Sequence, residues 1–209
     1  MNTIYTNFFD APPFDKGEIL RYAGTKESTA EIDSLINDCI DEVKSKLSYK
    51  VCYGHFPISF MEIKSEKLTK NLSGCDSFIL FAATIGIEID RLIAKYGKTA
   101  PSKALIFQAI GTERIESLCD EFCRFIECEY GYTKPRFSPG YGDLSIEVQK
   151  DFFNVLEPSK RIGLSLNESM LMSPSKSVTA IVGISGDKTT TKKSCTTCDK
   201  TDCLFRREL

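Results

Sequence analysis

The segment from about Ser102 to Glu129 constrains the fold more than any other part of this chain. It lies between Pro101, which suits the first turn of a helix, and Gly131, which suits the position after one. Its first half is apolar on almost every side, which is typical of a helix in the middle of a folded domain. The sequence therefore predicts one long buried helix, against which the other elements pack.

Shorter helices and strands are predicted on both sides of this segment. Helices are expected near Asp15–Ala23, from a capping box at Ser28–Glu31 to Leu47, near Gly86–Tyr96 and near Ser145–Leu156. Strands are expected within Tyr49–Phe60, at Ser77–Ala83 and at Val178–Ile184. Because helices and strands do not alternate as repeating units, the fold class predicted is α+β.

Composition narrows the range of functions. Of 209 residues, 27 are basic and 29 acidic, a balance that gives no reason to expect a nucleic-acid partner. No apolar run approaches the roughly 20 residues that span a bilayer, and Met1–Asp10 lacks the features of a secretory signal. A cytoplasmic, reducing location without a membrane partner is the expectation. The nine Cys are then more readily packed, metal-binding or redox-active than paired, and His55 is the single His.

The most unusual stretch is the turn Arg136-Phe-Ser-Pro-Gly140-Tyr141-Gly142-Asp143. Its Pro-Gly pair suits a type II turn, and its glycines allow a ligand to approach the backbone closely. Arg136 could bind a carboxylate, and the Tyr141 ring could pack on an apolar or aromatic ligand. The alternative is a surface turn whose Arg pairs with a carboxylate nearby in the fold.

Glu116 is the second candidate, because it lies on a largely apolar face of the predicted long helix with Ala109, Thr112, Cys119 and Cys123. A carboxylate in such a place requires a positive or hydrogen-bonding partner. Glu116 could receive the ammonium or hydroxyl groups of a ligand. It could equally be the structural partner of a buried Arg, either Arg136 or Arg114.

The chain ends in a polar tether and a group of thiols. After Gly186 the sequence loses its apolar residues, so two parts are predicted, a domain over 1–186 and a tether with a Cys-rich tail over 187–209. Cys195, Cys198 and Cys203 have a spacing that can bind zinc or an iron–sulfur cluster, with the fourth position open or filled by a core Cys or another subunit. The alternative is a redox-sensitive or incidental thiol tail. Cys39, Cys119 and Cys123 are expected to be small core residues.

Several segments together resemble one known family. The turn Arg136-Phe-Ser-Pro-Gly-Tyr resembles the Arg-x-x-x-Gly-Tyr signature of the activation domain of cobalamin-dependent methionine synthase, a domain that binds S-adenosylmethionine. The segments Phe78–Gly86, Ala109–Glu116, Arg161–Met170 and Ser173–Val178 are similar to this family in the same order. The resemblance extends from about Phe14 to Gly186 and is closest to the short stand-alone members. It implies a single α+β domain with a mainly antiparallel twisted sheet packed with helices.

The resemblance implies a role in the repair of a stalled cobalamin. The family presents S-adenosylmethionine, whose methyl group is transferred to the cobalt of a cobalamin protein once an electron donor has reduced it. Arg136 would hold the ligand carboxylate, Glu116 would face the ligand, and the backbone around Ser138 and Gly140 would line the site with Tyr141. The family's acidic contact near the N-terminus of the domain can be assigned to neither Asp10 nor Asp15 from the sequence.

The partners implied are a cobalamin-binding methionine synthase subunit or another corrinoid protein, and an electron donor such as flavodoxin or ferredoxin. The chain would be a methyltransferase component of methionine biosynthesis that contacts cobalamin only through its partner. The Asp-x-His-x-x-Gly motif for cobalamin does not occur around His55. Two alternatives remain: an iron–sulfur or zinc protein that passes electrons to a corrinoid partner through its Cys tail, and a scaffold that only docks to such a partner.

Overall fold

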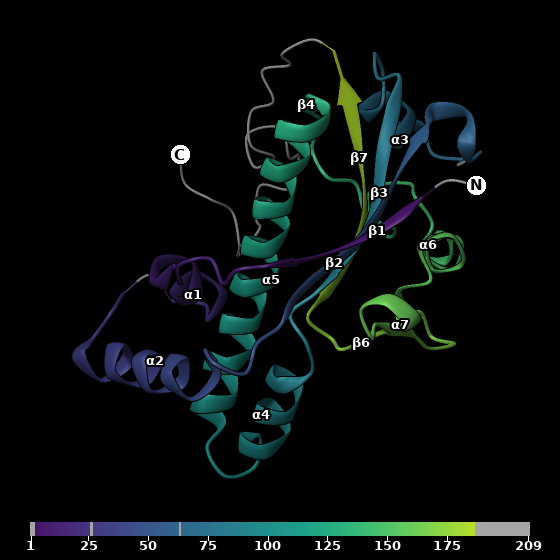
Figure 1. The fold of residues 1–209 in the computed structure, drawn as a ribbon. Coiled ribbons are helices and arrows are strands. Elements are labelled where there is room, and N and C mark those ends of the chain that lie inside the picture. The colour runs from purple at the N-terminus through teal and green to yellow at the C-terminus, as the bar shows by residue number, and fades with distance from the viewer. Residues whose placement is uncertain (1–2, 26, 63, 187–209) are drawn as a thin grey trace.

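The computed structural model describes residues 3–25, 27–62 and 64–186, which form a five-stranded antiparallel sheet with helices on both faces (Figure 1). The strands follow the order β1-β2-β3-β7-β4. Their bounds are β1 Ile4–Phe9, β2 Tyr49–Pro57, β3 Ser77–Thr84, β7 Ser177–Ser185 and β4 Tyr132–Thr133. Strand β7, the last of the described strands, thus lies between β3 and the short edge strand β4.

One face of the sheet is covered by the long helix α5, Pro101–Tyr130 (Figure 1). Ile79 and Phe81 of β3 point to this face and join a core that α5 shares with three other helices. These are α1 Lys16–Tyr22, α2 Ala30–Val43 and α4 Glu88–Tyr96. The middle of α5 is buried on most sides, with Ile110, Leu118 and Phe122 fully inaccessible.

The opposite face carries shorter elements. Phe78 and Leu80 alternate with the residues that face α5, as strand geometry requires, and enter a second core. The helices of this layer are α3 Glu66–Asn71, α6 Gln149–Leu156 and α7 Pro158–Arg161. The small hairpin β5 Ser165–Leu166 and β6 Met172–Ser173 and two 3-10 turns, Ile58–Phe60 and Ile146–Val148, complete the described elements.

The predicted fold class is confirmed: the chain is a single α+β domain with an antiparallel sheet and one long central helix. The ends of two predicted helices differ from the expectation. The N-cap of α2 is Thr29 rather than Ser28, and its side chain accepts from the amide of Ile32. The helix expected near Ser145–Leu156 begins as the 3-10 turn and becomes α-helical only at Gln149.

None of the helices in the described part of the chain is both long and apolar enough to span a membrane.

Candidate functional site between α1 and α5

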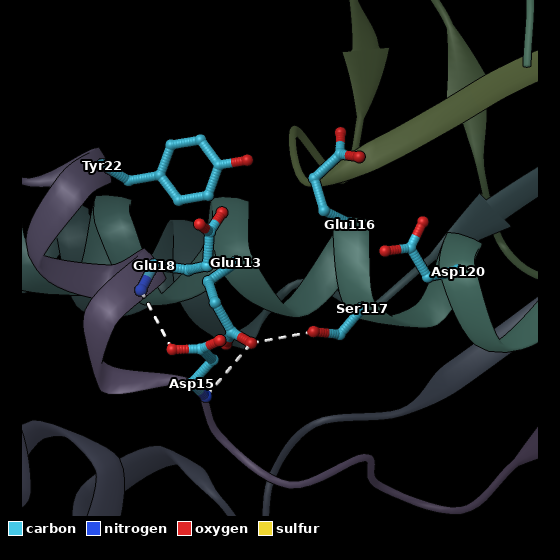
Figure 2. A pocket seen from close by; sticks show the side chains of 7 residues that line it. All are labelled: Asp15, Glu18, Tyr22, Glu113, Glu116, Ser117 and Asp120. Carbon is cyan, nitrogen blue, oxygen red and sulfur yellow. Dashed lines mark hydrogen bonds between the residues drawn. The ribbon is translucent and has the colours of Figure 1, made fainter. Parts of the chain in front are cut away.

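An acidic cleft of about 370 Å³ lies between α1 and the middle of α5 (Figure 2). Its lining side chains come from these two helices and from the residue that caps α1. They are Asp15, Glu18 and Tyr22 on one side and Glu113, Glu116, Ser117 and Asp120 on the other. Five of the seven carry carboxylates, so the cleft favours cationic groups.

A buried ion pair fixes the two helices that form the cleft. Arg114 is fully buried; it pairs with Glu113, and its Nη2 donates to the carbonyl oxygen of Pro13 at 2.7 Å. Glu113 accepts from Ser117 Oγ at 2.8 Å and from the amide of Asp15 at 3.4 Å. Because one charged pair holds both the chain before α1 and the turn of α5 beneath it, the position of α1 follows from α5.

Arg136 reaches α5 at the rim of this cleft. Its Nη2 lies 2.8 Å from Glu116 Oε2, and its Nη1 lies 2.6 Å from Asp120 Oδ1. Its side chain is 23% exposed, so both ion pairs are partly shielded from water. Arg114, the other partner considered for Glu116, instead pairs with Glu113. The fold thus brings Arg136 and Glu116 together, in the arrangement expected if the turn pairs with a local carboxylate.

The turn after Arg136 has the predicted type II form. The amide of Tyr141 donates to the carbonyl of Ser138 at 3.1 Å, and Gly140 at the third position has φ of +86°. Phe137 exchanges two backbone hydrogen bonds of 2.9 Å with Ile181, which attaches the start of the turn to β7. The Tyr141 side chain is 70% exposed at the tip of the turn.

Asp143 attaches the other end of the turn to α3. Its carboxylate accepts from Ser65 Oγ and from the amide of Glu66 at 2.8 Å, the latter at the N-terminus of the helix. The hydrogen bond from Ser65 is the main cause that holds the pKa of Asp143 below its ordinary value. The turn is therefore fixed at both ends, and Tyr141 projects from a supported backbone.

The groups around Arg136 have shifted pKa values. Burial raises the pKa of Cys119 well above its ordinary value and also raises that of Cys123, although the charge of Arg136 opposes both shifts. These thiols therefore stay protonated at neutral pH. Burial, followed by the charge of Glu116, raises the pKa of Tyr22, so its hydroxyl remains a neutral hydrogen-bonding group facing the cleft.

The cysteines of the described chain do not form a metal site. Cys39 and Cys119 are buried, as expected, and Cys123 is partly buried. No group of three or more His, Cys, Asp or Glu side chains able to hold a metal ion occurs among the described residues. Cys195, Cys198 and Cys203 lie outside the described residues, so the zinc or iron–sulfur site stays a prediction.

His55 lies on β2, away from the cleft. Its Nε2 is 2.7 Å from Ser77 Oγ, and its ring packs against that of Tyr130 at 4.8 Å between centroids. This agrees with its interpretation as an ordinary strand residue.

Several cleft residues were not singled out by the sequence. Asp120 carried a signal, because it follows Glu116 by one helical turn and so lies on the same side of the helix. Asp15 was left open as the acidic contact near the N-terminus, and the structure places it in the cleft with Glu116, while Asp10 does not line it. Glu18, Tyr22 and Ser117 gave no such signal, because their position depends on how α1 packs on α5.

The sheet, the central helix and the cleft define a class of protein by fold: an α+β domain with an antiparallel sheet enclosed by helices. No protein-family profile matches the chain, and neither does any curated protein. Among solved structures, a crystal structure of the MetH reactivation domain bound to AdoHcy superimposes with a TM-score of 0.66 at 16% identity. The match covers 90% of this chain and 80% of the other. The chain therefore has the fold of the MetH reactivation domain, which is the fold that the sequence resemblance implied.

Proposed function

We propose that this chain binds S-adenosylmethionine and supports the reductive methylation of cobalamin on a separate corrinoid protein. The shared fold supports the proposal, because the structural neighbour was crystallised with AdoHcy. The observation that carries it furthest is the contact between Arg136 and Glu116. These two candidates, 20 residues apart in the sequence, meet at the rim of the cleft between α1 and α5.

Arg136 can hold a ligand carboxylate without losing either ion pair. A guanidinium group has five N–H donors, of which Glu116 and Asp120 each receive one here. The carboxylate of Glu116, which lines the cleft, would accept hydrogen bonds from the ammonium or hydroxyl groups of the ligand. The backbone of Ser138 and Gly140 would form the wall beside the ligand, and the exposed ring of Tyr141 would pack on it.

The bound ligand supplies a methyl group on a positively charged sulfur, which passes to the reduced cobalt of the partner and leaves S-adenosylhomocysteine. The chain itself needs no general base for this transfer; it needs to fix the position of the sulfur relative to the partner. The turn Arg136–Asp143, which is fixed at both ends, and the buried helix α5 are rigid enough to hold the ligand in this way. The electron donor, flavodoxin or ferredoxin, and the identity of the corrinoid partner belong to the same proposal.

Isothermal titration calorimetry with S-adenosylmethionine and S-adenosylhomocysteine tests the binding step. The wild-type chain should bind both saturably, and Arg136→Ala should weaken binding at least tenfold, the effect of losing a hydrogen bond to a charged group. Arg124→Ala is the matched control, because Arg124 also pairs with a carboxylate of α5, Glu121, but does so on the exposed surface of the helix. Absence of binding by the wild-type chain at millimolar ligand would contradict the proposal.

A reactivation assay tests the second step. A corrinoid protein with oxidised cobalt, mixed with a reductant, S-adenosylmethionine and this chain, should show the absorbance change of methylcobalamin formation. The same mixture without the chain, or with Arg136→Ala, should show a slower change. An equal rate in all three mixtures would leave the chain a ligand-binding protein without this activity.

The Cys tail is the basis of the second candidate function, an iron–sulfur or zinc protein that passes electrons to a corrinoid partner. Three thiols within nine residues are its support. Anaerobic purification followed by metal analysis and a visible spectrum tests it. A colourless, metal-free protein with Cys195 intact would exclude this candidate.

A further inference from the structure

Lys176 is a buried cation that the proposed function has not used. It immediately precedes β7, is 8% exposed, and donates a hydrogen bond from Nζ to Thr112 Oγ1 on α5 at 2.9 Å. An ammonium group has three donors. Within the described ranges no ion pair and no second hydrogen bond involves this group, so two donors are available to a further acceptor.

The place of this side chain is set by Gly111. A Cβ at position 111 would lie 2.9 Å from both Cγ and Cε of Lys176, so any larger residue would displace it. Asp90, whose negative charge acts on Lys176, is already bound by the amide and hydroxyl of Ser175. Its attraction does not outweigh burial, which lowers the pKa of Lys176. The fold thus holds a cation against α5 without giving it a direct carboxylate partner.

Lys176 and Arg136 approach α5 on the two sides of Glu116. Helix α5 and β7 run side by side in the same direction (Figure 1), with Thr112 beside the start of the strand and Gly131 beside its end. Thr112 and Glu116 are one helical turn apart, about 6 Å between their Cβ atoms. Arg136 binds on the far side of Glu116, where it also meets Asp120.

The two cations differ in what they can still bind. Arg136 is compensated by two carboxylates, whereas among the described residues the ammonium group of Lys176 hydrogen-bonds to a single hydroxyl. An amino acid carries a carboxylate and an ammonium on one carbon, so it needs a cation and an anion a short distance apart. Lys176 binds Thr112, which lies one helical turn before Glu116, so a cation and an anion follow one another along one face of α5.

We propose that Lys176 binds the carboxylate of S-adenosylmethionine and thereby selects ligands that carry the amino-acid moiety. The inference rests on the proposed function and deepens it: Glu116 receives the ammonium group, and the carboxylate lies between Lys176 and Arg136 rather than on Arg136 alone. Lys176 is a binding residue in this arrangement, and the reacting sulfur lies elsewhere on the ligand.

Calorimetry with two ligands separates this role from a structural one. S-adenosylhomocysteine has the amino-acid moiety, and 5′-methylthioadenosine is the corresponding nucleoside thioether without it. The wild-type chain should prefer S-adenosylhomocysteine. Lys176→Met should lower the affinity for S-adenosylhomocysteine at least tenfold and leave the affinity for 5′-methylthioadenosine unchanged, since only the contact to the carboxylate is lost. Lys150→Met, at an exposed lysine of α6, is the control and should change neither affinity.

The other outcomes are decisive as well. If Lys176→Met lowers the affinity for both ligands equally, or for neither, the assignment of Lys176 is overturned and the proposed function stays intact. No preference between the ligands in the wild type would do the same. Failure of the wild-type chain to bind either ligand would overturn the proposed function itself. If Lys176→Met is not folded at the assay temperature by circular dichroism, Lys176→Gln provides the same comparison with a polar side chain.

Discussion

Arg114 shows how a single residue positions one wall of the cleft. It is the largest side chain that the fold buries completely, and its partners are Glu113 and the carbonyls of Pro12 and Pro13. Arg114→Met should lower the free energy of unfolding by about 3–5 kcal/mol, because Glu113 is left as a buried charge without its partner. Urea denaturation followed by circular dichroism measures this loss.

The double variant Glu113→Gln with Arg114→Met is the control for that prediction. It removes the unpaired charge, so it should recover part of the stability that the single variant loses. A single variant as stable as the wild type would show that the pair does not hold α1 on α5.

Gly140 is the residue whose backbone conformation defines the turn. Gly140→Ala should cost about 1–2 kcal/mol of stability, because φ is +86° and a Cβ would lie 3.3 Å from Cδ1 of Ile146. It should also weaken binding of S-adenosylmethionine, since the backbone beside the ligand moves. Thermal denaturation and calorimetry measure the two effects.

Gly24→Ala is the matched control for Gly140. Its φ is +83°, and nothing lies within 4 Å of its Cβ position, so its conformational cost is similar, whereas it is far from the turn in sequence and does not line the cleft. Binding that falls equally in both variants would mean that general destabilisation, not the shape of the turn, sets the affinity.

At the residue scale, the sequence predicted the turn better than the cleft. The Pro-Gly pair specified a type II turn locally, and the pairing of Arg136 with Glu116 was one of the alternatives considered. Asp15 could not be assigned, because its position depends on the contact of Arg114 with a segment about 100 residues away in the chain.

Among the elements, α3 depends most on a distant residue. Its N-cap Ser65 and the amide of Glu66 both bind Asp143, which is 77 residues from Glu66. Because the folded state lowers the pKa of Asp143, the stability that its carboxylate contributes is present above the unfolded value of about 3.9. It is lost as the pH falls through the lower folded value.

The corresponding variant is Asp143→Asn. It should be less stable than the wild type at pH 7, and the difference should shrink below about pH 4 and vanish below the folded pKa. Urea denaturation at a series of pH values tests this. A difference that does not depend on pH would show that the charge of Asp143 does not matter to the cap.

The elements that the sequence predicted are those whose patterns are local. The long helix was expected from Ser102 to Glu129 and extends from Pro101 to Tyr130. Strand β1 and helix α3 were not predicted. Helix α3 has six mostly polar residues and is capped by Asp143. Strand β1 is an edge strand whose Phe9 is partly buried against Phe122 and Phe125 of α5, a contact between distant segments.

At the scale of the whole molecule, the predicted division of the chain after residue 186 can be tested directly. Strand β7 ends at Ser185, and the buried residues of the described part of the chain lie between Ile19 and Ser185. A chain that ends at Gly186 should therefore keep its melting temperature within a few degrees and bind S-adenosylmethionine with unchanged affinity. A much lower melting temperature in calorimetry would show that residues 187–209 belong to the domain.

The strand order has a consequence for how the chain reaches its native state. Strand β7 is the last of the described strands, yet it lies inside the sheet between β3 and β4, so its pairing with β3 closes a loop that begins at Thr84 and ends at Ser177. Such distant pairing makes folding slow, because the entropy of loop closure is lost before the contacts form. A nascent chain that ends before Ser177 lacks β7 and leaves one edge of β3 unpaired. Premature termination there should therefore yield a truncated chain that associates through this edge.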